Sequence, residues 1–194
     1  MADTPYHHGD LPSALVSAAM ELLEENGAAE LSLRATARRA NVSTGAPYRH
    51  FPDRTALLSA VAAVGYTELG QELIAISAAP QTPDELAAVA VGYVQFALRR
   101  PGLFRVMFAE GCDATSPDRV AAVAAIRGYL GSIVEAAVPD APKEPMSIAV
   151  WALVHGLAFL YLDGKLDSSS PASVADEVAS SVRAVIGARP AAKG

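Results

Sequence analysis

The chain has 194 residues, 52% of them hydrophobic, and a net charge of −6 at pH 7. This length suits one or two compact domains with a sizeable core. Its single cysteine, Cys112, excludes an intramolecular disulfide and a thiolate-rich metal site. We find no run of 18 or more apolar residues and no signal peptide, so we expect a cytoplasmic protein without a membrane-spanning helix.

The first part of the chain predicts helices separated by turn signals. The expected helices run from Leu11 to Asn26, over residues 33–40, from Ser43 to about His50, and from Asp53 to about Ser77. Ser32, Ser43 and Asp53 are the expected N-caps of the last three. Asn41 stands where the chain must turn, and it tolerates the left-handed conformation better than most residues do.

The second part also predicts helices. Thr82-Pro83-Asp84-Glu85 is a capping box that opens a helix to Arg100. Further helices are expected over residues 103–111, 119–137, 146–162 and 173–187. Because alternating strand patterns are nearly absent, we expect an all-α fold of about nine helices.

Positive charge is concentrated between residues 31 and 55. This window holds five arginines and one aspartate, a net charge of +4, within an acidic chain. Such a basic face can attract phosphate, although a solvated helix face is the common alternative for any charge cluster. Charge alone leaves the two interpretations about even.

Residues 33–50 have the organisation of a helix-turn-helix, two short helices joined by a tight turn. In that motif the start of the second helix faces base edges in the major groove. Here it carries Ser43, Thr44 and Gly45, which are small enough for a close backbone approach. Tyr48, Arg49 and His50 follow and can contact phosphates or base edges.

The segment "LSLRATARRANVSTGAPYRHFPDRTALLSAV", with Leu11 to Gly27 before it, resembles the N-terminal domain of the tetracycline-repressor (TetR) family. The resemblance covers about the first third of the chain. It implies an all-helical, homodimeric DNA-binding protein with a divergent C-terminal ligand-binding domain. The chain departs from the family pattern at two positions, with Asn41 in place of the usual turn glycine and Pro47 where many members have an aliphatic residue.

The resemblance assigns roles residue by residue. Arg34 matches a position of the second helix that can read or clamp a base. Thr44, Gly45 and Tyr48 match groove-facing positions, and His50 and Arg54 match phosphate contacts. Tyr48 could instead pack on the first helix, which its basic neighbours make the weaker interpretation. The full predicted DNA-binding set is Arg34, Ser43, Thr44, Gly45, Tyr48, Arg49, His50 and Arg54.

The resemblance also divides the chain. We expect a helix-turn-helix DNA-binding domain over residues 1–55 and a ligand-binding and dimerisation domain over residues 56–194. The long helix over about residues 53–77 would connect them. The break at Ala79-Pro80-Gln81 marks its end.

Aromatic and methionine side chains at helical spacing predict an apolar cavity in the second domain. The predicted lining residues are Tyr93, Phe96, Phe104, Met107, Phe108, Trp151, His155 and Phe159. Each residue alone is more typical of a packed core. As a set they favour a cavity for an apolar or aromatic effector, with His155 as its polar group.

The string "WALVHG" is similar to the Trp-His-Gly (WHG) signature of one TetR C-terminal subfamily. The family's dimer is built by the last two helices, and Val178, Val182 and Val185 offer an apolar stripe on the final helix. Two-fold symmetry would place two recognition helices about 34 Å apart on a near-palindromic operator.

These observations predict a ligand-responsive transcriptional regulator, a repressor as is most common in the family. One alternative is a TetR-fold ligand-binding protein without sequence-specific DNA binding. A small helical enzyme is the weakest alternative, because we find no G-x-S-x-G, metal motif or phosphate-binding glycine loop. His7 and His8 are a weak metal signal, so no metal or cofactor is expected.

Overall fold

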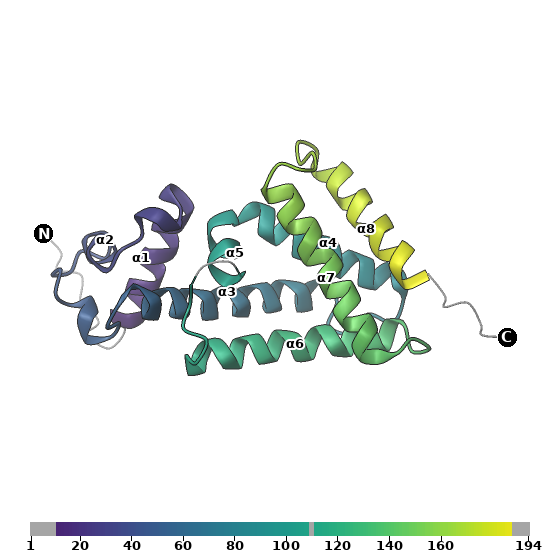
Figure 1. The fold of residues 1–194 in the computed structure, drawn as a ribbon, viewed down its shortest axis with the longest axis horizontal. Coiled ribbons are helices and arrows are strands. Elements are labelled where there is room, and N and C mark those ends of the chain that lie inside the picture. Colours follow the sequence, from purple (N-terminus) through teal and green to yellow (C-terminus); the bar gives the residue numbers. More distant parts are fainter. Residues whose placement is uncertain (1–10, 109–110, 188–194) are drawn as a thin grey trace, which may run out of the picture. The chain divides into compact units, whose positions relative to one another are not determined.

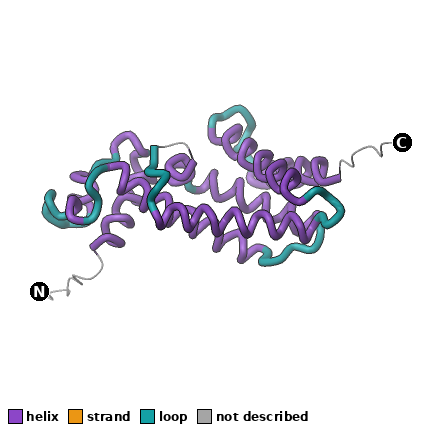
Figure 2. Tube along the Cα trace, turned by 60° about the horizontal axis from the view of Figure 1, so that its bottom comes forward, coloured by secondary structure: helices purple, strands orange, loops and turns teal. Residues whose placement is uncertain are grey.

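The computed structural model describes residues 11–108 and 111–187. Within them it holds eight α-helices, two short 3-10 helices and no strand, which confirms the predicted all-α fold (Figure 1, Figure 2). The α-helices are α1 (Leu11–Asn26), α2 (Leu33–Arg39), α3 (Arg54–Ile76), α4 (Pro83–Arg99), α5 (Pro101–Phe108), α6 (Pro117–Ala137), α7 (Lys143–Leu162) and α8 (Pro171–Gly187). The 3-10 helices are η1 (Ala28–Glu30) and η2 (Pro47–Arg49). His7 and His8 lie outside the described residues.

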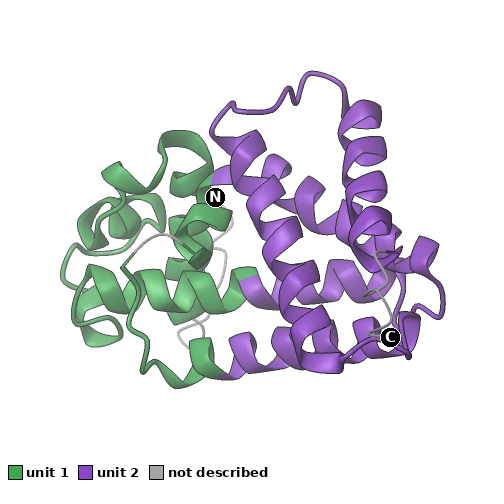
Figure 3. Cartoon of the chain, turned by 45° about the vertical axis from the view of Figure 1, so that its right-hand side comes forward, with its two compact units in different colours: residues 1–65, 102–120 green, residues 66–101, 121–194 purple. Residues whose placement is uncertain are grey.

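The chain forms two compact units, coloured separately in Figure 3. The first comprises residues 1–65 and 102–120, and the second comprises residues 66–101 and 121–194. The first unit thus continues past the expected boundary at residue 55 and includes most of α5. Helix α3 runs without interruption from the first unit into the second.

Local signals fix the helix ends in the first unit. Gly27, at φ 73°, ends α1. The Ser32 hydroxyl accepts from the Ala35 amide at 3.1 Å, and the Asp53 carboxylate accepts from the Ala56 amide at 2.8 Å. These caps are the ones expected from the sequence.

Two glycines let α5 pack closely within the first unit. A Cβ on Gly102 would lie 2.6 Å from the carbonyl oxygen of Leu23 in α1. One on Gly65 in α3 would lie 2.7 Å from the sulfur of Met107. The Leu23 carbonyl is backbone and cannot move aside, so position 102 requires glycine, whereas the Met107 side chain could shift to accept a Cβ at position 65.

Helix α4 is the central element of the second unit. It packs most extensively against α8 and then against α7. The valines of α8 that recur every fourth residue, Val174, Val178 and Val182, are buried. Val178 and Val182 are fully buried within the single chain, so the expectation that they face a second copy is wrong for these two. Their spacing marks an internal core stripe, and only Val185 is partly exposed.

Helices α6 and α7 are long and apolar enough to cross a membrane, with mean hydropathies of 1.4 and 1.7. Length and composition alone do not place either helix in a membrane, so the absence of a membrane-spanning helix stays a prediction. Only 22% and 28% of the two apolar windows are buried, so both helices present apolar surface outward. The core helix of a soluble protein passes the same test.

Candidate nucleic-acid interface and small-molecule cavity

The turn after α2 has the geometry of a helix-turn-helix connection. Asn41 adopts φ 54°, the left-handed conformation expected of it. The Val42 amide then donates to the Ala37 carbonyl at 3.0 Å, which closes the end of α2. The chain is thereby redirected into the segment from Ser43 to His50.

That segment is not the regular α-helix expected from the sequence. The Ala46 amide donates to the Ser43 carbonyl at 2.9 Å, and the His50 amide donates to the Pro47 carbonyl at 2.9 Å. Both are three-residue spacings, and only Pro47–Arg49 forms a 3-10 helix. Pro47 has no amide hydrogen with which to continue an α-helical ladder, which explains the difference.

The candidate recognition residues nevertheless face outward. Pro47 is buried and anchors the segment. The predicted contact residues of this segment, Ser43, Thr44, Gly45, Tyr48, Arg49 and His50, are all exposed. Half of the Tyr48 surface, 50%, is accessible. This exposure argues against Tyr48 as a packing residue.

Arg34 from α2 and Tyr48 from η2 line one shallow depression in the first unit. Ser32, Leu33, Pro52, Asp53 and Arg54 complete its lining. Arg34 and Tyr48, predicted from separate parts of the motif, are thus brought together on one exposed surface. A guanidinium and a phenol placed this way can contact base edges or phosphates.

Arg54 has a structural engagement that the sequence did not reveal. Its Nε donates to the Leu31 carbonyl at 3.0 Å, and its Nη2 donates to the Ala28 carbonyl at 2.7 Å. Arg54 therefore holds the connection between α1 and α2 against the start of α3. The contact of Arg54 with a phosphate remains a prediction, and it would use the guanidinium N–H groups that do not bond to these two carbonyls.

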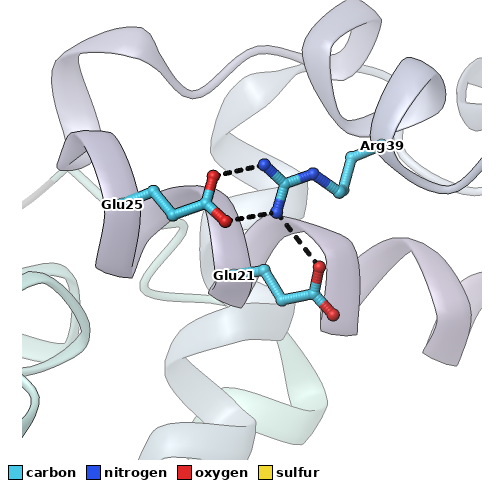
Figure 4. Close-up of polar contacts among 3 residues, drawn as sticks. All are labelled: Glu21, Glu25 and Arg39. Atoms are coloured by element: carbon cyan, nitrogen blue, oxygen red, sulfur yellow. Dashed lines mark hydrogen bonds and ion pairs between the residues drawn. The ribbon is translucent and has the colours of Figure 1, made fainter.

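Arg39 is neutralised by two acidic side chains of α1 (Figure 4). Its Nη1 donates to Glu21 at 3.1 Å and to Glu25 at 2.9 Å, and its Nη2 also donates to Glu25. The guanidinium bonds hold the pKa of the Glu25 carboxyl below its usual value. Among the five arginines between residues 31 and 55, Arg39 is thus the one whose charge is least available to a phosphate.

The second unit contains a small apolar cavity. Its accessible volume is about 20 Å³, room for about one water molecule. The lining residues are Leu73, Leu86, Val89, Ala90, Tyr93, Leu130, Ile133, Val134, Ser147, Val150, Trp151 and Val154. No charged side chain is among them.

A hydrogen-bonded trio lies at this cavity. The Tyr93 hydroxyl is 3.1 Å from Nδ1 of His155, and the Trp151 indole Nε1 donates to the same hydroxyl at 3.4 Å. Burial raises the pKa of Tyr93 and lowers the pKa of His155. Both are therefore neutral near pH 7, and we infer that Tyr93 donates to His155.

The structure places only part of the predicted cavity set together. Tyr93 and Trp151 line the cavity, and His155 bonds to Tyr93. Phe159 packs edge-on against His155 with ring centres 4.9 Å apart, and Phe96 is buried elsewhere in the core. Phe104, Met107 and Phe108 belong to the first unit and do not line this cavity.

The aliphatic lining residues were missed because nothing in the sequence distinguishes them from ordinary core. Leu86, Val89 and Val154 follow the same helical spacing as residues that line no cavity. Among the described residues, no group of three or more His, Cys, Asp and Glu is arranged to hold a metal ion.

Two family models match the chain. Residues 15–61 match "Bacterial regulatory proteins, tetR family" and residues 86–185 match "Tetracyclin repressor-like, C-terminal domain". The chain belongs to the TetR family. The N-terminal match contains the exposed turn and the Arg34–Tyr48 depression, and the C-terminal match contains Tyr93, Trp151 and His155. The TetR family and its fold are those of transcriptional regulators rather than enzymes, while the Trp-His-Gly subfamily stays a prediction.

Solved structures agree with this TetR assignment. A protein of unknown function from Rhodococcus sp. RHA1 is 32% identical, with a TM-score of 0.77, covering 93% of this chain and 97% of that one. A TetR transcriptional regulator from the same organism is 22% identical, with a TM-score of 0.60, and the match covers 92% of this chain and 95% of that one. The second likeness shows the fold alone. No curated protein matches the sequence.

Proposed function

We propose that this TetR-family chain is a ligand-responsive transcriptional repressor of the cytoplasm that binds a near-palindromic operator as a homodimer. The observation that carries the proposal is the exposed surface of Arg34, Tyr48 and Arg49 around the helix-turn-helix turn. Among the described residues, none of these three side chains has an ion pair or a hydrogen bond to the protein. Their polar groups are thus available to phosphates and base edges.

The dimer surface we propose is on α7. Its outward-facing residues Ala149, Ala152, Gly156 and Leu160 are exposed and recur on one side of the helix. Leu160 is 44% accessible, and the three smaller residues permit a close approach of another helix. A second copy covering this stripe would also explain why so apolar a helix is largely unburied.

The effector is proposed to be a small molecule, apolar or aromatic, held by the second unit. It acts only if it binds one arrangement of the two recognition segments better than the other. Helix α3 is the proposed mechanical link, because its residues 54–65 belong to the first unit and its residues 66–76 to the second.

A salt titration of binding to a labelled generic duplex tests the DNA contact. The logarithm of the association constant should fall linearly with the logarithm of the salt concentration, with a slope of about −0.9 for each phosphate contacted. Arg49→Ala should make the slope shallower by about 1. Lys165→Ala, which removes an exposed charge of the second unit, should leave it unchanged.

Absence of DNA binding by the folded protein at low salt would contradict the proposal. It would favour the alternative of a TetR-fold ligand-binding protein that does not recognise DNA. The exposed, cationic turn supports the repressor over that alternative. No observation in the structure favours an enzyme.

A further inference from the structure

An open groove of about 400 Å³ lies in the second unit, between α6 and the first turns of α7. Its walls include Arg127, Gly128 and Gly131 from α6 and Glu144 and Ile148 from α7. This volume is in the range of small-molecule sites. A Cβ on either glycine would meet nothing within 4 Å, so the wall of α6 is open there.

The groove and the inner cavity share three residues, Leu130, Ser147 and Trp151. These three residues therefore lie between the two spaces, and the Trp151 indole is the largest side chain among them. Its 3.4 Å bond to the Tyr93 hydroxyl is at the long end for an N–H···O bond. We therefore expect that displacing this ring opens the inner cavity to the groove and breaks its hydrogen bond to Tyr93.

Charge in the groove favours no ionic ligand. Arg127 and Glu144 carry opposite charges, and Lys143 is paired with Glu135. The inner cavity has no charged lining residue, so an ion placed there would lose its hydration without compensation. The polar side-chain groups that line the inner cavity are the Tyr93 hydroxyl, the Trp151 indole N–H and the Ser147 hydroxyl, and the last already donates to the Lys143 carbonyl.

We propose that Trp151 is a gate, and that the effector is an uncharged, largely apolar molecule that enters from the α6–α7 groove. It displaces the indole, fills the joined space above Tyr93, and either offers a hydrogen-bond acceptor to the freed Trp151 N–H or donates to the Tyr93 hydroxyl in place of Trp151. This inference rests on the proposed effector response. It remains compatible with the α7 dimer stripe, because Ser147 and Trp151 lie on a different side of the helix from Ala149, Ala152 and Gly156, and only Ile148 of the groove borders that stripe.

Two dyes with the same ring system test the chemistry. N-phenyl-1-naphthylamine is uncharged, and 8-anilinonaphthalene-1-sulfonate adds a sulfonate to it. We expect the uncharged dye to bind one per chain, with energy transfer from Trp151, the chain's one tryptophan. The sulfonate dye should bind at least tenfold more weakly. Equal affinities, or no saturable binding of the uncharged dye, would overturn the inference.

Matched variants on α4 test the location. Ala90→Leu fills the inner cavity and should weaken binding of the uncharged dye at least tenfold. Ala88→Leu makes the same change at an exposed position of the same helix and should leave binding of the uncharged dye unchanged. Unchanged binding by Ala90→Leu overturns the site.

The gate has its own readout, which does not depend on the folding of Ala90→Leu. Trp151→Ala removes this indole and should accelerate association of the uncharged dye, measured by stopped flow with direct dye excitation. An unchanged association rate overturns the gate. Titration of wild type with duplex DNA separates the two proposals, because loss of DNA binding with the dye results intact contradicts the repressor and leaves the Trp151 site standing.

Discussion

Arg34 and Tyr48 are the two side chains whose contact with DNA the structure makes easiest to test. They come from α2 and η2 and meet at one shallow, exposed depression. Arg34→Ala and Tyr48→Ala should each weaken operator binding by about 1–3 kcal/mol, the usual worth of a specific base contact. Fluorescence anisotropy at constant salt measures this, with Lys165→Ala as the control. Wild-type affinity in either variant would remove that residue from the interface.

Glu25 predicts a pH dependence of stability. Its folded pKa is held below the usual 4.5 by Arg39, so the folded state favours the ionised carboxyl. The resulting stabilisation is complete above that pH and is lost as the pH falls through the folded pKa. Wild type should therefore melt above Glu25→Gln at pH 7, and the two melting temperatures should converge in acid. A difference that persists unchanged in acid would show that the carboxylate is not its source.

Single residues also show what charge counting in a sequence omits. Arg34 and Arg39 each add one positive charge to the net charge of residues 31–55, but Arg39 is bonded to Glu21 and Glu25 of the preceding helix. Arg54 is likewise held by two backbone carbonyls. Such pairings depend on how helices pack, which local sequence does not specify.

At the scale of elements, helix α5 depends on a glycine. Gly102→Ala would place a methyl group 2.6 Å from a backbone oxygen of α1, which cannot move aside as a side chain can. We expect destabilisation of about 1–3 kcal/mol, typical of overpacking. Gly128→Ala, on an exposed and open part of α6, should stabilise by about 0.5–1 kcal/mol through helix propensity. Chemical denaturation measures the free energy of unfolding of both variants. Equal changes in the two variants would contradict the close packing of α5 against α1.

The helices themselves could be predicted well, since their ends carry local signals. Ser32, Asp53 and Thr82 cap the helices that the sequence assigned to them. The sequence predicts a helix over residues 43–50, but Pro47 has no amide hydrogen to donate to the backbone hydrogen bonds of an α-helix. The α8 valines show a further limit, because one apolar stripe is equally suited to an internal core and to a dimer interface.

At the scale of the whole molecule, the exposed stripe of α7 predicts obligate association. Ala152→Arg should give a monomer with wild-type helicity and greatly weakened operator binding, because a charge at the centre of an apolar interface is left unpaired. Gln71→Arg adds the same charge at an exposed position of α3 and should remain a dimer. Sedimentation velocity measures both. A dimeric Ala152→Arg would place the interface elsewhere.

Operator recognition can be measured by selecting bound duplexes from a random DNA pool, at near-physiological salt to suppress binding through phosphates alone. A dimeric operator-binding regulator should enrich a near-palindromic site whose half-sites are separated by about one turn of DNA. Enrichment of nothing by a folded, dimeric protein would contradict this function, and the chain would then be a TetR-family ligand-binding protein without an operator.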